Sequence, residues 1–194
     1  FDANDESLPA EARLDLLEAR CVILAAVAEV PTQGGSSMQD RVFRGTFDPY
    51  VEQAIAPATS LRDVARTEFA LRALTVAVKT ARPVAPPGGA VGLGVGVGGG
   101  EVRRPLAVQL MESVMGSLEM VVRGKSDRVV DALCRLLKYA VRGALRDDMR
   151  VHVPRMAEFF VALFSERAHA VVLYAAGVLL GEYAATGGAA AGAA

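Results

Sequence analysis

The sequence "SDRVVDALCRLLKYAVRGALR", residues 126–146, decides the fold of this chain. On an α-helix that turns about 100° per residue, its charged side chains fall within an arc of about 80°. Apolar side chains fill most of the remaining circumference, which predicts an amphipathic helix with one broad buried side. The charged arc, called the charged stripe below, consists of Arg128, Asp131, Arg135, Lys138, Arg142 and Arg146.

The rest of the chain carries similar helical periodicity, and no strand-like alternation competes with it. Ser60 and Asp63 have the spacing of a capping box, Ser126 is placed to cap the helix that follows it, and Pro154 is tolerable only near a helix start. Pro49 lies inside a segment and predicts a kink or a break there. We therefore predict an all-α chain of about seven helices, at about 10–29, 38–56, 60–82, 105–122, 127–145, 150–164 and 168–183.

Three short connections predict that these helices form antiparallel hairpins. Hairpins that start near residues 105 and 150 repeat at roughly 45 residues, within the range of HEAT and armadillo units. No single hairpin can bury its own apolar face, so the units are expected to stack into a HEAT-repeat α-solenoid. The predicted organisation is HEAT-like helices over 1–82, a flexible Gly/Pro-rich insertion over 83–104, two HEAT repeats over 105–183 and a low-complexity tail over 184–194.

Composition and motifs predict no enzyme, cofactor or metal site. Gly94, Gly96 and Gly99 formally satisfy G-x-G-x-x-G, but prolines stand where the preceding strand of a nucleotide site should be. The only two histidines, His152 and His169, lack metal-ligand spacing. Three further features indicate structural roles. Asp147 and Asp148 are expected to be loop or cap residues, Cys21 and Cys134 are expected to be buried reduced thiols, and the apolar run 170–181 is too short to cross a membrane.

Positive charge is concentrated in one part of the chain. The formal net charge is −1, yet residues 123–155 hold nine Lys or Arg against four Asp. Within the charged stripe, Arg128 with Asp131 and Asp131 with Arg135 have the spacing of helical ion pairs. The other cations have no such neighbour, which leaves open a solvated face, acidic residues of an adjoining repeat, a partner protein, or nucleic-acid phosphate. The low net charge disfavours the last of these.

Two stretches resemble a known family. The runs "DRVVDALCRLLKYAVR" (127–142) and "HVPRMAEFFVALFSERAHAVVLYAAGVLLGEY" (152–183), preceded by "VQLMESVMGSLEMVV" (108–122), are similar to the middle of importin-β family receptors, in the transportin-SR and importin-thirteen branch. The resemblance is clear over about residues 111–183. It implies a solenoid whose second helices line the concave side, here 10–29, 60–82, 127–145 and 168–183.

The resemblance also implies a function. Such receptors shuttle between cytoplasm and nucleus, contact nucleoporins and hold protein cargo inside the arch, and GTP-bound Ran releases the cargo. The branch imports Ser/Arg-rich splicing factors. The positive charge of the stripe, if it lines the concave side, predicts a cargo with an acidic or phosphorylated surface, without direct nucleic-acid or membrane binding. The expected cargo-binding residues are Arg128, Arg135, Lys138, Arg142 and Arg146. The alternative is a cytoplasmic HEAT or armadillo scaffold unrelated to nuclear transport.

Overall fold

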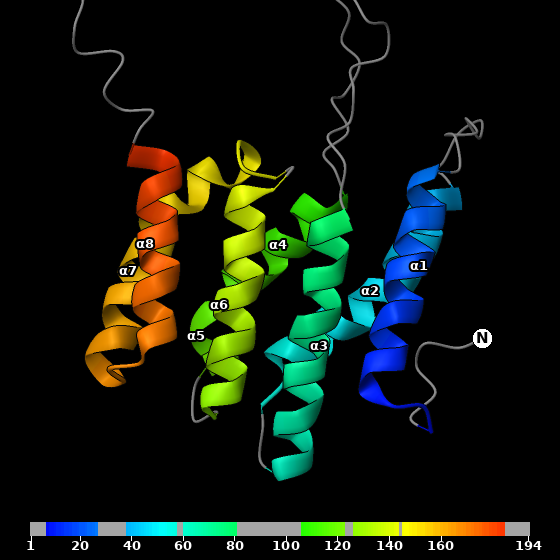
Figure 1. The fold of residues 1–194 in the computed structure, drawn as a ribbon, viewed down its shortest axis with the longest axis horizontal. Helices are drawn as coiled ribbons and strands as arrows, with labels where there is room; N and C mark the ends of the chain where they lie inside the picture. Colours follow the sequence, from blue (N-terminus) through cyan, green and yellow to red (C-terminus); the bar gives the residue numbers. More distant parts are fainter. Residues whose placement is uncertain are drawn as a thin grey trace, which may run out of the picture.

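The computed structural model describes residues 7–26, 38–57, 60–80, 106–122, 126–143 and 145–184. Within these ranges the chain forms α-helices and one short 3-10 helix, η1, with no strand, so the predicted all-α fold is confirmed (Figure 1). The helices are α1 (Ala10–Ala26), α2 (Met38–Ile55), α3 (Leu61–Thr80), α4 (Leu106–Gly116), α5 (Leu118–Val122), α6 (Asp127–Arg142), η1 (Asp148–His152), α7 (Val153–Glu166) and α8 (Ala170–Ala184).

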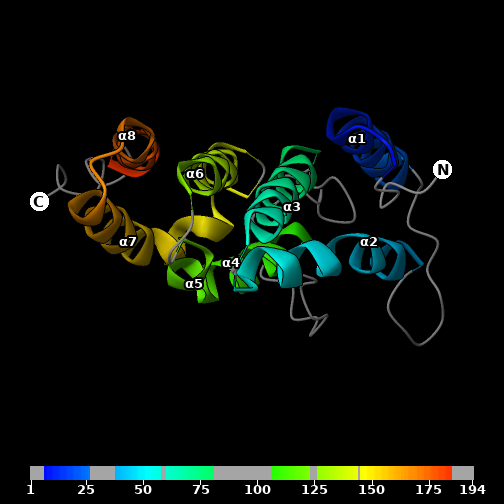
Figure 2. The ribbon, with the colours of Figure 1, turned by 90° about the horizontal axis from the view of Figure 1, so that it is seen from below.

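The helices form two rows, which Figure 2 shows nearly end-on. One row contains α1, α3, α6 and α8, and each of these helices packs against the next. The other row contains α2, α4, α5 and α7, and α2, α5 and α7 pack against α3, α6 and α8 respectively. Consecutive hairpins therefore stack side by side, as an α-solenoid requires.

The two rows are bowed in the same direction. In Figure 2 the end helices α1 and α8 are raised above α3 and α6, so their row lies on the inner side of a shallow arc. We call it the inner row and the other the outer row. Its four helices correspond to the segments that the sequence assigned to the concave side, and in Figure 1 they all run in the same direction.

One continuous apolar core fills the space between the rows. The helix α6 lies near the middle of this core and buries nine residues, all on one side. Its three leucines are at most 1% exposed, so burial rather than helix propensity accounts for most of its stability. The nine residues are Val129, Val130, Ala132, Leu133, Cys134, Leu136, Leu137, Ala140 and Val141.

The helix starts follow the predicted chemistry in part. The backbone N–H of Ser60 donates to the carboxylate of Asp63 at 3.0 Å, and the N–H of Asp63 donates to the Ser60 hydroxyl at 3.2 Å, which confirms the capping box. Pro154 lies in the first turn of α7, as expected. Ser126 occupies the N-cap position of α6, but its side chain makes no capping hydrogen bond.

Two of the predicted segments contain a residue that weakens a helix interior, and one of the two is divided there. The segment 105–122 is divided into α4 and α5 at Ser117, next to Gly116, because glycine weakens a helix interior by about 1 kcal/mol relative to alanine. The segment 38–56 forms a single helix, α2, which continues through Pro49, so the break that was the alternative to a kink does not occur. In that turn the Thr46 hydroxyl donates to the Val42 carbonyl at 2.7 Å, a bond that often accompanies helix bending.

The predictions for the insertion 83–104 and for the tail from residue 185 onward lie outside the described residues. Within the described helices, none has both the length and the apolar character needed to cross a membrane.

Candidate functional site

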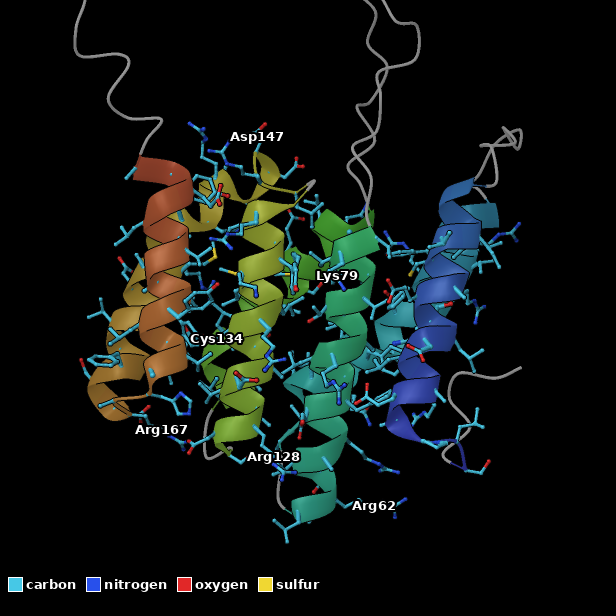
Figure 3. The ribbon with its side chains drawn as sticks, viewed as in Figure 1. Arg62, Lys79, Arg128, Cys134, Asp147 and Arg167 are labelled. Atoms are coloured by element: carbon cyan, nitrogen blue, oxygen red, sulfur yellow. The ribbon has the colours of Figure 1, made fainter. Side chains whose placement is uncertain are left out.

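The charged stripe lies along the solvent-facing side of α6, opposite the nine buried residues. Arg128, Arg135 and Arg142 are exposed, whereas Lys138 and Arg146 are half-buried. Arg146 lies in the turn beyond α6, because the helix predicted to reach residue 145 ends at Arg142. Since a helix rises about 1.5 Å per residue, the part from Arg128 to Arg142 is roughly 21 Å long. The structure therefore places a row of cations on the inner row, between α3 and α8 (Figure 3).

The lower part of the stripe contains one intrahelical ion pair. The Arg135 Nε lies 2.8 Å from the Asp131 carboxylate, which confirms that predicted pair. The predicted pair between Arg128 and Asp131 is wrong, because the described residues give Arg128 no ion pair. The carboxylate of Asp127, the first residue of α6, lies instead 3.6 Å from the guanidinium group of Arg167, the C-cap residue of α7. Figure 3 shows Arg62, Arg128 and Arg167 near the same end of the inner row.

The upper part of the stripe pairs with α8. Glu182 accepts two ion pairs, from Arg142 Nε at 3.2 Å and from Arg146 Nε at 3.4 Å. Arg146 also donates to the Glu182 carbonyl, and the Tyr183 hydroxyl donates to the Arg146 carbonyl. Of the alternatives that the sequence left open, these two arginines therefore have an acidic residue of the adjoining repeat as a partner. The carboxylate of Glu182, from the adjoining repeat, forms ion pairs with both arginines, because the orientation of α8 about its axis directs this side chain toward α6.

Lys138 has aromatic rather than acidic neighbours. Its ammonium group lies 4.6 Å from the ring centroid of Tyr139 and 5.8 Å from that of Tyr174 on α8. The ammonium group of Lys79 on α3 lies 5.5 Å from the same Tyr139 ring. Cations are attracted to the face of an aromatic ring, so these contacts are favourable. Among the described residues, neither lysine forms an ion pair with a carboxylate.

Lys79, Tyr139 and Tyr174 were not among the predicted site residues. Lys79 precedes Lys138 by 59 positions in the sequence. Only the packing of α3 against α6 brings them to one ring, and Figure 3 shows Lys79 on the side of α3 nearest α6. No local spacing in the sequence could have indicated this contact.

The site has the chemistry of an anion-binding surface. Five cations of the stripe and Lys79 face two carboxylates, Asp131 and Glu182, which leaves excess positive charge. Arginine presents a planar fork that matches carboxylate or phosphate oxygens, whereas lysine acts as a point charge. The arrangement therefore suits a partner with several negative groups along an extended surface.

The other polar candidates lie apart from the stripe or beneath it. Among the residues described, no cluster of three or more His, Cys, Asp or Glu side chains could hold a metal ion. Cys21 and Cys134 are free and buried, and burial raises the pKa of both thiols, that of Cys134 to about 12. Asp147 is the N-cap of η1, although its side chain makes no capping bond.

Part of the chain matches a known protein family. Residues 104–193 match the family model described as the transportin-3/importin-13 fourth TPR domain. The matched region contains α4 to α8 and the whole charged stripe. No curated protein and no solved structure matches the chain significantly.

Proposed function

Because residues 104–193 match the model of the transportin-3/importin-13 fourth TPR domain, we propose that the chain belongs to this branch of the importin-β family and is the cargo-holding part of a nuclear import receptor. In this proposal, the charged stripe binds a cargo protein with an acidic or phosphorylated surface. Arg128, Arg135, Lys138, Arg142 and Arg146 supply the positive charge, and the chain contributes binding rather than catalysis.

The observation that supports this proposal most strongly is the position of the stripe. All of its residues except Arg146, which follows the end of α6, lie on α6, the third helix of an inner row of four, where a cargo inside the arc would contact them. Arg135 and Arg142 have 64% and 48% of their side-chain surface exposed, so their ion pairs leave room for a ligand. Exposed ion pairs of this kind contribute only about 0–1 kcal/mol to stability. The binding of a partner with several negative charges can compensate for their loss.

The family supplies the remaining parts of the proposal. Receptors of this kind carry cargo between cytoplasm and nucleus and contact nucleoporins on the way. Release by GTP-bound Ran involves the full-length receptor, and Ser/Arg-rich splicing factors are the proposed cargo class. Within the inner row each helix packs against the next one, so the arc can change curvature by small shifts at several interfaces.

A charge-reversal experiment tests the stripe. Changing Arg135, Lys138 and Arg142 to Glu in the full-length receptor should weaken binding of an acidic cargo by at least about tenfold, because each reversal turns an attraction into a repulsion. A matched control changes three outer-row arginines, Arg41, Arg44 and Arg155, to Glu and should leave affinity near wild type. Unchanged cargo affinity in the stripe variant, together with normal thermal unfolding, would remove the stripe from the binding site.

The release of cargo by GTP-bound Ran distinguishes an import receptor from the alternative, a cytoplasmic HEAT or armadillo scaffold with the same fold. In a pull-down of full-length receptor with bound cargo, GTP-bound Ran should release the cargo, whereas GDP-bound Ran should not. Retention of cargo under both conditions would favour the scaffold.

A further inference from the structure

We propose that a pocket between α2 and α4 binds an arginine side chain presented by a basic segment of a second partner protein. This inference is independent of the proposed function, because the pocket lies between two helices of the outer row, whereas the charged stripe lies on the inner row. The helices α2 and α4 pack against each other, and Figure 2 shows both in the outer row. Of the two, only α4 belongs to the region that matches the family model.

The periodicity of both helices directs polar side chains into this pocket. On α2, Arg44 and Asp48 are four positions apart, and on α4, Gln109 and Ser113 have the same spacing, so each pair lies on one face of its helix. These side chains and Glu112 line a pocket of about 270 Å³. Pockets for drug-sized ligands measure about 300–1,000 Å³, so this pocket suits a single side chain better than a cofactor.

The charge of the pocket favours a cation. Asp48 and Glu112 contribute two carboxylates and Arg44 one guanidinium group, so the lining has an excess of negative charge. Arg44 and Asp48 have the spacing of a helical ion pair, but Arg44 donates instead to the side-chain oxygen of Gln109. The described part of the chain therefore gives Asp48 no hydrogen bond or ion pair, and a bound cation would provide its partner.

The apolar part of the lining favours arginine over lysine. It consists of Phe43 and Leu110. A guanidinium group is planar, stacks on aromatic rings and forms two parallel hydrogen bonds with a carboxylate, whereas an ammonium group is a strongly hydrated point charge. The same chemistry occurs within the chain, where the guanidinium carbon of Arg13 lies 4.0 Å from the ring centroid of Phe69. A pocket that combines a ring with a carboxylate therefore suits an arginine side chain.

The test is a titration of the isotopically labelled 194-residue chain, followed by the NMR signals of its backbone amides. The three probes are N-acetyl-arginine methylamide, the citrulline analogue, which has nearly the same shape without the charge, and the lysine analogue. Asp48→Asn removes the carboxylate without a partner, and Arg44→Gln removes the cation of the pocket. The control Glu158→Gln removes a carboxylate from an exposed position of α7 in the same row. Circular dichroism melting curves verify that each variant folds.

We expect the arginine probe to shift amide signals of α2 and α4 with a dissociation constant on the order of 1–10 mM, as suits a single side chain. The lysine probe should bind more weakly, and the citrulline probe should not saturate the site. Asp48→Asn should weaken arginine binding by about fivefold, the loss of one charge-assisted contact. Arg44→Gln should strengthen it, because a repelling charge is removed, and Glu158→Gln should behave as wild type.

Three results would overturn the inference: no binding of the arginine probe, equal binding of the citrulline probe, or wild-type affinity in folded Asp48→Asn. If Asp48→Asn does not fold, Glu112→Gln provides the same comparison, because it removes the other carboxylate of the pocket. None of these results bears on the proposed function, which is tested separately by charge reversal in the stripe on the inner row.

Discussion

The helices α6 and α8 are neighbours in the inner row, but their exposed sides differ completely. α6 exposes the charged stripe and buries nine residues, whereas α8 buries only Val172, Ala175, Val178 and Leu179. The exposed side of α8 is apolar, with Leu173, Tyr174 and Leu180 each more than half exposed. Its one carboxylate, Glu182, points toward α6.

This difference indicates that α6 and α8 have different roles within the inner row. α6 has neighbours on both sides, α3 and α8, so its apolar side is fully covered and its free side is available for charge. α8 is the last helix described in the row, and it contributes a carboxylate and a ring to the site built on α6. The following three predictions test this division, beginning with the largest expected effect.

The first prediction compares buried and exposed leucines. Leu137→Ala in α6 should lower the free energy of unfolding by about 2–5 kcal/mol, because the side chain is 1% exposed and its removal leaves a cavity. Leu180→Ala in α8, where the side chain is 64% exposed, should change it by no more than about 0.5 kcal/mol. Urea unfolding followed by circular dichroism measures both. Equal losses would show that α8 is covered as completely as α6.

The second prediction concerns alkaline pH. Burial raises the pKa of Cys134 from 9.0 to about 12, so between these values the unfolded chain releases a proton that the folded protein keeps. The free energy of unfolding should then fall as pH rises above about 9, by at most about 1.4 kcal/mol per pH unit from this group. Below about pH 8 the thiol is protonated in both states and contributes no slope.

Substitutions of Cys134 in α6 and of Tyr183 in α8 distinguish the contributions of the two helices to this pH dependence. Burial also raises the pKa of Tyr183 of α8, from 10.0 to about 12, and acts in the same direction. Cys134→Ala should reduce the alkaline slope from about pH 9 upward, and Tyr183→Phe only from about pH 10 upward. Urea unfolding at several pH values between 8 and 11 measures these slopes. A slope that neither substitution changes would show that other groups carry the alkaline loss.

The third and smallest prediction concerns the link between the helices. Glu182→Gln removes two partly exposed ion pairs, with Arg142 and Arg146, and should lower the free energy of unfolding by about 0.2–1 kcal/mol at low salt. The loss should shrink in high salt, because screening weakens the pairs in the wild type. Glu166→Gln, at an exposed position of α7, is the control. A larger, salt-independent loss would mean that Glu182 acts through packing or backbone geometry.

Sequence patterns predicted α6 well and α8 less well for a physical reason. In α6, charged and apolar residues divide the circumference clearly, so both the helix and its buried side follow from the periodicity. In α8 nearly every residue from Ala170 to Gly181 is apolar or small, so no pattern indicates which side faces the core. The sequence therefore could not predict that α8 is oriented with Glu182 toward Arg142. It also could not predict the tertiary contact between Lys79 and Tyr139.

The tyrosine side chains on the inner row also give the protein an intrinsic spectroscopic signal. The chain has no tryptophan and four tyrosines, of which Tyr139, Tyr174 and Tyr183 each lie beside Lys79, Lys138 or Arg146. Most of its near-ultraviolet absorbance and intrinsic fluorescence therefore originates at the surface proposed to hold cargo. An anion that draws these cations away from the rings should perturb the tyrosine spectrum directly, so that binding can be followed without any attached dye.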